Sequence, residues 1–296
     1  MANKKEPIAP PLNLDFGYMN AATVLTRQPD EHETTTIALV GCGGTGSYMA
    51  QHISRIMRVM LEQGRRVRAL FIDPDRVEEK NIGRQLFCDA EIGMNKAETL
   101  ALRYGATWGL DIAAHAKRFE PEMVKAYGGS PLTVIVGCVD NAAARKSIAA
   151  SLNNRPGSAP RIWWLDCGNH EEAGQVLLGA APKIEHVKEW FTSASICKSL
   201  PSPALQCPEL LQAKPEETNV SKLSCAELTL LNVQSLQINN RVAAEAADML
   251  TRLLVTRNLK RFACEINMAA GSMKSTYVTP ESIAAIQKGK RINEHR

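Results

Sequence analysis

The sequence lacks the features that mark several large classes of protein. No apolar run approaches the roughly 18 residues that a membrane-spanning helix needs. The first residues, MANKKEP, lack the apolar core of a signal peptide. Lys and Arg number 35 against 31 Asp and Glu, and a net charge of +4 does not indicate a nucleic-acid binder. We therefore expect a cytoplasmic protein that binds neither membranes nor nucleic acid.

Closely spaced cysteine pairs are also absent. The cysteines stand at positions 42, 88, 138, 167, 197, 207, 225 and 264, and no two of them form a Cys-x-x-Cys pair. The strongest sequence signal for zinc is therefore missing, and in a reducing compartment these residues are expected to be free thiols. An irregularly spaced zinc site made of Cys197, Cys207, Cys225 and Cys264 stays open as an alternative.

The pattern of apolar residues predicts the fold class. Hydrophobic residues make up 45% and charged residues 22% of the 296 residues, which suits one large α/β domain or two small ones. Helical patterns, such as 96–108 and 142–152, alternate with apolar segments typical of buried strands. Those segments are 36–40, 67–72, 132–136, 161–165 and 175–180. The alternation predicts a Rossmann-like, doubly wound, mainly parallel sheet.

Changes in composition divide the chain into segments. Residues 1–35 are expected to form an N-terminal arm with little regular structure, ahead of the Rossmann-like half at 36–181. The proline-rich stretch 182–224 predicts a long crossing loop. Residues 225–286 are expected to form a long helix, to about residue 256, and an antiparallel hairpin of strands 262–268 and 272–278. The basic residues 287–296 form a tail.

A glycine-rich loop links the first predicted strand to the helix that follows it. Gly41, Gly43, Gly44 and Gly46 stand there, and small residues let a phosphate approach the amides of a helix N-terminus. The loop is not a Walker P-loop, because no Gly-Lys-Ser/Thr follows it. An acid that ends the second strand, Asp73, also fits a nicotinamide-binding fold, so an NAD(P)-dependent oxidoreductase stays an alternative. A tight turn without a ligand is another.

A second polar cluster follows the second predicted strand. Residues 73–85, DPDRVEEKNIGRQ, contain Asp73, Asp75, Asn81, Arg84 and Gln85. An acid at a strand end can bind ribose hydroxyls, and an arginine can bind phosphate oxygens through a charge-assisted fork. A solvated loop with internal hydrogen bonds is the alternative for the last three residues.

Two further charged residues complete the candidate nucleotide site. Lys96 can add a point charge, and Asp140, which follows the candidate strand 132–136, could hold Mg²⁺ through its carboxylate. Open α/β sheets bind ligands outside the carboxyl ends of their strands, where all these residues are predicted to lie.

Taken in order, these motifs resemble the ThiF/MoeB/ubiquitin-activating (E1-like) superfamily. The resemblance rests on the glycine loop, the Asp-x-Asp-x-Val…Asn-x-x-Arg-Gln stretch, the lysine and the Cys-Val-Asp-Asn segment, and covers residues 37 to about 180. The segments PALQCPELL at 203–211 and SCAE at 224–227 look similar to the ThiF-related proteins of PRTRC gene cassettes. Those cassettes are typically borne on plasmids or mobile elements and also encode small partner proteins.

The resemblance implies ATP, Mg²⁺ and an adenylation reaction. The substrate would be the C-terminal carboxylate of a small ubiquitin-like or sulfur-carrier protein, and residues 36–181 would form the ATP-binding, adenylating half. By the family pattern Asp73 would hold the ribose; Asn81, Arg84 and Lys96 would engage the phosphates, with Gln85 close by; and Asp140 would support Mg²⁺. The resemblance also implies a homodimer.

Many members of the superfamily then transfer the acyl group to a cysteine. Ser224 and Glu227 form a capping-box pattern, which places Cys225 in the first turn of the long helix, where the helix dipole favours a thiolate. A small residue packed at the helix start is the alternative. Cys197 matches the family offset approximately and is the alternative thiol, whereas Cys207 is expected to be structural.

The sequence departs from the family in two respects, which keeps other functions open. It lacks the paired zinc cysteines, so zinc is not expected, and its only arginine before the glycine loop is Arg27. Arg27 could reach the partner subunit's ATP site or could be an ordinary exposed loop residue. A catalytically reduced scaffold that binds a partner protein, and an enzyme that adenylates a small molecule or tRNA base, remain alternatives.

Overall fold

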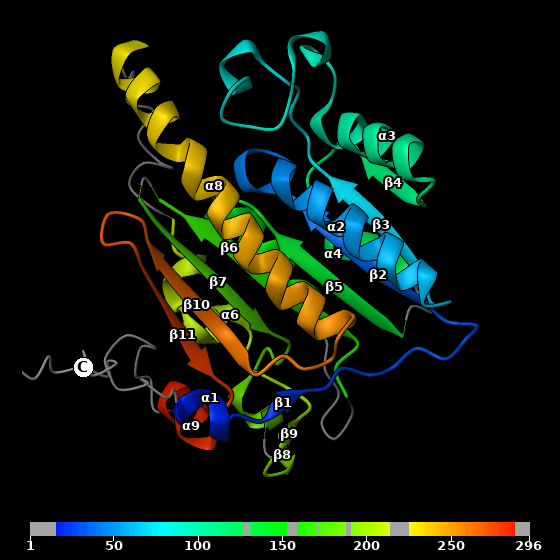
Figure 1. Ribbon diagram of the computed structural model, residues 1–296, viewed down its shortest axis with the longest axis vertical. Helices are drawn as coiled ribbons and strands as arrows, with labels where there is room; N and C mark the ends of the chain where they lie inside the picture. Colours follow the sequence, from blue (N-terminus) through cyan, green and yellow to red (C-terminus); the bar gives the residue numbers. More distant parts are fainter. Residues whose placement is uncertain are drawn as a thin grey trace, which may run out of the picture.

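An eight-stranded sheet forms the centre of the molecule, in the order β11-β10-β7-β6-β5-β2-β3-β4 (Figure 1). The computed structural model describes residues 16–126, 131–152, 159–170, 172–187, 191–213 and 225–287, with only the backbone of residues 16, 125, 126, 186, 187, 225–236 and 287. The strands are β2 (Thr34–Val40), β3 (Arg66–Ile72), β4 (Ile112–His115), β5 (Leu132–Gly137), β6 (Ile162–Asn169), β7 (Ala173–Gly179), β10 (Arg261–Asn267) and β11 (Ser272–Tyr277).

The sheet consists of a parallel part and an antiparallel part. Strands β4, β3, β2, β5 and β6 run parallel to one another. The pairs β6–β7, β7–β10 and β10–β11 are antiparallel. The predicted Rossmann-like, mainly parallel sheet and the closing hairpin are therefore confirmed. Strand β4 was not predicted, because its short Ile-Ala-Ala-His segment is only half-buried at the edge and carries no strong apolar pattern.

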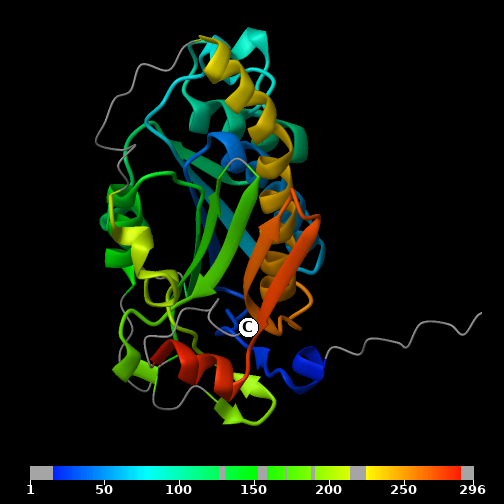
Figure 2. The same ribbon diagram turned by 90° about the vertical axis from the view of Figure 1, so that its left-hand side faces the viewer.

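Helices cover both faces of the sheet (Figure 2). Along β2, Ile37 and Leu39 pack on one face and Ala38 and Val40 on the other, as the alternation of a strand requires. The first face is covered by α2 (Gly44–Glu62), α3 (Lys96–Trp108) and α8 (Cys225–Leu254). The second is covered by α4 (Pro121–Ala126), α5 (Ala142–Ser151) and α6 (Pro203–Gln206). This is the doubly wound arrangement that the alternation predicts.

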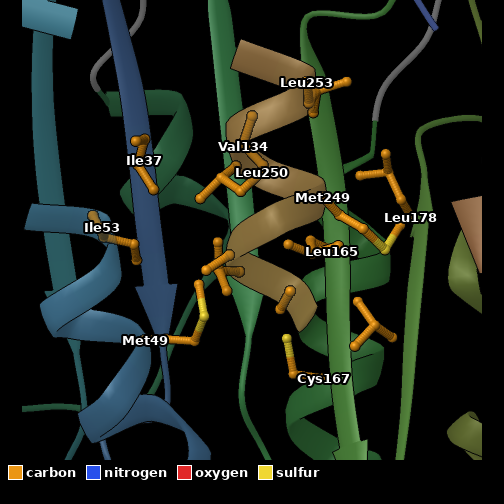
Figure 3. Packing of buried hydrophobic residues seen from close by; sticks show 14 of the residues in the cluster. Ile37, Met49, Ile53, Val134, Leu165, Cys167, Leu178, Met249, Leu250 and Leu253 are labelled. Atoms are coloured by element: carbon orange, nitrogen blue, oxygen red, sulfur yellow. The ribbon is translucent and has the colours of Figure 1, made fainter. Parts of the chain in front are cut away.

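The long helix α8 lies diagonally across the first face. Figure 3 shows Met249, Leu250 and Leu253 of α8 packed over Val134 of β5 and Leu165 of β6. These leucines are at most 1% exposed, and full burial of a leucine contributes about 2 kcal/mol. The helix ends at Leu254, two residues before the predicted end at about 256, and its C-terminal half is firmly anchored to the core.

A smaller sheet lies beyond the end of the main one, in residues that were expected to belong to the N-terminal arm and the crossing loop. Strand β1 (Thr23–Val24) pairs with β9 (Ile196–Cys197), which pairs with β8 (Phe191–Ser193). The predicted arm 1–35 therefore contains regular structure, including α1 (Phe16–Asn20) and the start of β2. Such short strands are fixed by distant partners, as when the Val24 amide donates to Leu259 O, so they leave no periodic signal in the sequence.

The described part of the crossing loop is likewise built of short elements. It contains η3 (Ile184–Val187), β8, β9, α6 and η4 (Pro208–Leu211), and the helix α9 (Pro280–Gln287) follows the hairpin. Residues 1–15 of the arm, 214–224 of the crossing loop and 288–296 of the tail lie outside the described residues. No helix within the described part of the chain combines the length and apolar character needed to cross a membrane.

Candidate active site

The glycine loop is folded so tightly that two of its glycines serve the loop itself. Gly41 has a φ of +87°, and a Cβ placed on it would lie 2.5 Å from Cys138 O. A Cβ on Gly46 would lie 1.9 Å from Gly41 O. Because any side chain would clash with backbone at both positions, these glycines are required for the strand-to-helix turn whether or not a ligand binds.

The two remaining glycines have different surroundings. A Cβ on Gly44 would lie 2.6 Å from Asn239 Oδ1 on α8, so a side chain there would collide with the long helix. A Cβ on Gly43 would meet only the side-chain amide of Gln85, at 3.8 and 3.9 Å. Gly43 is therefore the position of the loop where the backbone is most open to a ligand, and it is also the N-cap residue of α2.

The N-terminus of α2 is suited to an anion. Its N-cap, Gly43, has no side chain and makes no capping hydrogen bond. The first-turn amides of a helix point outward and carry the positive end of the helix dipole. A phosphate group placed beside Gly43 would meet these amides.

Asp73, at the end of β3, joins the glycine loop to the segment that follows β3. Its carboxylate accepts hydrogen bonds from the amide of Cys42 at 2.6 Å and from the amide of Asp75 at 2.8 Å. Burial raises the pKa of Asp73, and the two amides and Lys96 act in the opposite direction. Each carboxylate oxygen keeps a second lone pair, so the predicted ribose contact is compatible with this structural role.

Lys96 begins α3 and is held close to Asp73. It is 7% exposed, and its Nζ lies 3.4 Å from Oδ2 of the exposed Asp75. Asn95 fixes this geometry, because its Oδ1 accepts from the Glu98 amide while its Nδ2 donates to the carbonyls of Asp73 and Asp75. Sequence reasoning missed Asn95, although an asparagine directly before a helical pattern is an N-cap signal.

The segment that carries Asn81, Arg84 and Gln85 is attached to α2 by a hydrogen bond from the Leu86 amide to Ser47 Oγ, at 2.9 Å. Asn81 lies in η1 (Glu79–Asn81), is 2% exposed, and accepts from the Glu78 amide at 2.9 Å. Asn81 thus makes a hydrogen bond within its own loop, as the alternative interpretation of a loop with internal hydrogen bonds expects.

Gln85 faces the open position of the glycine loop. It is 6% exposed, and its Oε1 is buried without a hydrogen-bond partner among the described residues. A buried acceptor without a donor is costly, and this one lies beside Gly43. Gln85 thus presents an atom that a bound nucleotide could satisfy.

Arg84 and Asp140 follow different strands, β3 and β5, and their charges interact. Burial lowers the pKa of Arg84, while the charges of Asp140 and Glu78 act in the opposite direction. Asp140 is exposed and follows β5, directly before Asn141, whose side chain caps α5 by accepting from the Ala144 amide. The opposite charges of Arg84 and Asp140 therefore interact, which is compatible with the prediction that both residues act at the phosphates.

The donors present fit magnesium better than zinc. In the described part of the chain, no three His, Cys, Asp or Glu side chains gather as metal ligands. Mg²⁺ needs only one or two carboxylates beside substrate phosphates, so a single carboxylate such as that of Asp140 is compatible with the ion. The zinc alternative loses support, because Cys197 donates to Ser199 O and Cys264 interacts with Glu265 O.

The candidate thiols differ in accessibility. Cys197 is fully buried, and burial raises its pKa to about 12. Cys207 is half-buried, and burial and Glu209 raise its pKa. Cys225 is the first residue of α8, whereas Ser224, and with it the predicted capping box, lies outside the described residues. In this conformation the protein holds the Cys197 thiol in an unreactive form.

Two arginines form ion pairs that sequence reasoning did not assign. Arg145 of α5 donates from Nε to Asp166 Oδ1 of β6 at 3.1 Å, with exposures of 6% and 0% for the two side chains. The only sequence signal for this pair is an acid inside an apolar strand. Arg27 forms an ion pair with Glu33 of its own chain at 3.1 Å.

Comparison with known proteins agrees with this geometry. Residues 19–157 match the model of the ThiF family. The chain contains a ThiF family domain. The ThiF domain spans α1 to α5 and so carries the glycine loop, Asp73, Arg84, Lys96 and Asp140. The predicted ThiF/MoeB/E1-like superfamily is thereby confirmed, while closeness to the PRTRC proteins stays a prediction.

Curated relatives of the ThiF domain are larger proteins. Ubiquitin-like modifier-activating enzyme 5 of Drosophila willistoni is 27% identical over 151 residues, which cover 47% of this chain and 34% of the relative. The enzyme of the same name from Drosophila persimilis is 26% identical over 151 residues. The match thus spans about a third of the length of these relatives.

Solved structures share the fold over most of the chain. The Escherichia coli MccB structure with ATP superposes with a TM-score of 0.51 at 16% identity, covering 85% of this chain and 66% of MccB. The PaaA structure gives a TM-score of 0.50 at 13% identity and covers 84% of this chain and 64% of PaaA. At these identities the likeness concerns the fold alone.

Proposed function

We propose that this protein is an E1-like enzyme that uses ATP to adenylate the C-terminal carboxylate of a small ubiquitin-like or sulfur-carrier protein. One observation carries the proposal. At the carboxyl edge of the parallel strands, the open backbone of Gly43 and the unpartnered Oε1 of Gln85 lie beside each other. Lys96, Arg84 and Asp140 stand at the same edge. The ThiF domain, and a fold shared with an MccB structure that contains ATP, support the same chemistry.

In the proposed reaction a carboxylate oxygen of the substrate attacks the α-phosphorus of ATP, and the bond to pyrophosphate breaks. The substrate becomes an acyl adenylate and pyrophosphate leaves. The protein's task is to neutralise negative charge as it shifts toward the leaving group. Lys96 and Arg84 supply fixed positive charge and the α2 N-terminus supplies amide donors, while Asp73 is placed to hold the ribose.

Asp140 would hold Mg²⁺, with Arg84 beside it. When bound, the ion offsets phosphate charge and orients the leaving group. The exposed carboxylate of Asp140 can reach an ion that also binds the phosphates, and the nearby guanidinium limits the build-up of charge at that point.

The names of the relatives support a small protein or peptide as the substrate. The Drosophila enzymes are named for activating ubiquitin-like modifiers, and MccB is a biosynthetic enzyme solved with N-formylated MccA. We propose that the present protein likewise accepts a polypeptide carboxylate, and that it does so as a homodimer. In that dimer Arg27 would have to leave Glu33 before it could reach the partner subunit's site.

We also propose that Cys225 receives the acyl group. Its thiolate would attack the acyl carbonyl carbon, forming a thioester and releasing AMP. Figures 1 and 2 place the start of α8 at the same end of the molecule as the segment 73–95, which carries the arginine and glutamine. Cys197, the alternative, would first have to leave its buried position.

A scaffold that binds a partner without chemistry is the second candidate, and an NAD(P)-dependent oxidoreductase is the third. The scaffold is favoured by the lack of paired zinc cysteines and by the burial of the alternative thiol Cys197. Asp73 at the end of β3 is compatible with an oxidoreductase. That function gives no role to Arg84, to Lys96 or to the unpartnered Oε1 of Gln85.

ATP–pyrophosphate exchange tests the proposal directly. The purified protein is assayed with each small protein encoded beside its gene, in full-length form and without the C-terminal residue. Exchange that depends on one partner and on its last residue supports adenylation. ATP binding without exchange favours the scaffold, and binding of NAD(P) in place of ATP favours the oxidoreductase.

The thioester is tested in the same mixture by a non-reducing gel. A band that disappears in Cys225→Ala, while exchange persists, supports the assignment of Cys225. A band unchanged in Cys225→Ala but lost in Cys197→Ala would move the role to Cys197.

A further inference from the structure

A buried amide on α8 lies against the glycine loop. Asn239 is 4% exposed and stands within the buried face of the helix, between Ile238 and Val242. Its Oδ1 accepts hydrogen bonds from Thr45 Oγ1 at 3.1 Å and from Asn169 Nδ2 at 2.6 Å. One side chain therefore joins α8 to the first turn of α2 and to the end of β6.

The contact between Asn239 and the loop leaves no room for a side chain. A Cβ on Gly44 would lie 2.6 Å from Asn239 Oδ1, 2.8 Å from its Nδ2 and 2.9 Å from its Cγ. Gly44 thus belongs to the glycine motif because α8 approaches it, a role that differs from letting a phosphate approach.

An apolar residue would fill this part of α8 more cheaply than an amide. Burying an amide costs free energy unless it is hydrogen-bonded, and both donors that satisfy Asn239 Oδ1 belong to the edge of the sheet that carries the candidate site. Thr45 is the second residue of α2, so its position fixes the first-turn amides that would face the phosphates.

From this geometry we infer that Asn239 is a positioning residue for the nucleotide loop, through which the crossing helix α8 sets the affinity of the site for ATP. The inference rests on the proposed nucleotide site. Asn239 does not touch the reacting atoms; it holds Thr45, and with it the turn that begins at Gly43. Cys225 lies about four helical turns earlier on the same helix, so one helix joins the residue proposed above as the thiol to the nucleotide loop.

The test compares Asn239→Ala with Asn240→Ala, an exposed asparagine one position along the same helix. ATP affinity is measured by calorimetry on folded protein, and exchange is measured over a range of ATP and of carboxylate substrate. We expect Asn239→Ala to raise the Kd and the KM for ATP about tenfold. The KM for the carboxylate substrate should stay unchanged, and Asn240→Ala should match the wild type.

Substitutions of Thr45 test the same hydrogen bond without changing any residue of α8. Thr45→Val removes the hydroxyl with little change of shape and should weaken ATP binding, whereas Thr45→Ser, which keeps the hydroxyl, should restore it. The double variant Asn239→Ala/Thr45→Val should bind ATP no more weakly than the worse single variant, because both remove the same hydrogen bond.

Wild-type ATP affinity in folded Asn239→Ala and Thr45→Val would overturn the inference, since the amide would then serve only to pack α8. If the wild type binds ATP but shows no exchange, the result would count against the proposed function. The role of Asn239 could then still be tested by the ATP affinities of the variants. A wild type that binds no nucleotide would overturn both proposals.

Discussion

The two parts of the main sheet carry different tasks. The parallel strands β3, β2 and β5 end at one edge, where Asp73, the glycine loop and Asp140 follow them. In the antiparallel part, β7, β10 and β11 alternate in direction, and α8 rests partly on β7 and β10. Parallel strands bring all their carboxyl ends to one edge, which is why the candidate chemistry gathers there and the antiparallel part provides support.

The largest expected difference between the parallel and antiparallel parts is in the effect of substitutions on enzymatic activity. Lys96→Ala and Asp140→Ala are each expected to lower the rate of ATP–pyrophosphate exchange by about 100-fold or more, because a fixed charge at the phosphates is lost. Lys274→Ala, which removes an exposed lysine on β11, should leave the rate unchanged. Full exchange by Asp140→Ala would remove Asp140 from the site.

The second largest effect is expected on folding stability, when a buried ion pair of the parallel part is compared with a half-exposed pair on α8. Asp166→Asn leaves Arg145 buried without its charged partner, and loss of one member of a buried pair costs about 3–5 kcal/mol. Arg252→Gln breaks a half-exposed pair with Asp248 on α8, which should cost less than about 1 kcal/mol because solvent screens the charges. Urea unfolding measures both, and equal costs would contradict the difference in burial.

A smaller loss of folding stability is expected from a substitution at the contact between α8 and the glycine loop. Gly44→Ala should destabilise the fold by about 1–3 kcal/mol, since the new methyl group overlaps the amide of Asn239. In an Asn239→Ala background, which lacks the amide, the same Gly44→Ala change should cost less. Thermal unfolding monitored by circular dichroism compares the two, and an unaltered Gly44→Ala would mean that α8 shifts freely.

The smallest expected effect is a difference in the alkylation of two cysteines, which can be measured in the folded protein. Iodoacetamide at pH 8 should modify the exposed Cys88 and spare Cys264 in β10, whose pKa burial raises to about 12. Peptide mapping by mass spectrometry in the presence and absence of urea measures this difference. Rapid modification of Cys264 in the folded protein would show that the antiparallel part opens readily.

The same thiols predict how stability depends on pH. Unfolded thiols ionise near the ordinary value of 9.0, whereas folded Cys197 and Cys264 stay protonated to about 12. Their contribution is therefore complete below pH 9.0 and is lost as the pH rises toward 12. Cys264→Ala should reduce this alkaline loss in urea titrations at several pH values, and an unchanged slope would contradict it.

The sequence predicts the parallel part of this molecule better than its connections. Buried strands and the glycine loop are local patterns, so β2, β3, β5 and the residues at their ends could be placed from the sequence. The hydrogen bond between Thr45 and Asn239 joins residues 194 positions apart, and the pair Arg145–Asp166 joins two elements that only the fold brings together. Such contacts leave no periodic trace, and β1 was missed for the same reason.

The core described above predicts that the family segment does not fold as a separate unit. The ThiF match ends at residue 157, yet Ile37 and Met49 within it share one apolar cluster with Leu165, Met249 and Leu250 beyond it. A fragment that stops at residue 157 would expose this face of β5 and α2 to water and should aggregate. The end of the family match and the boundary of cooperative folding are therefore expected to fall at different places in this chain.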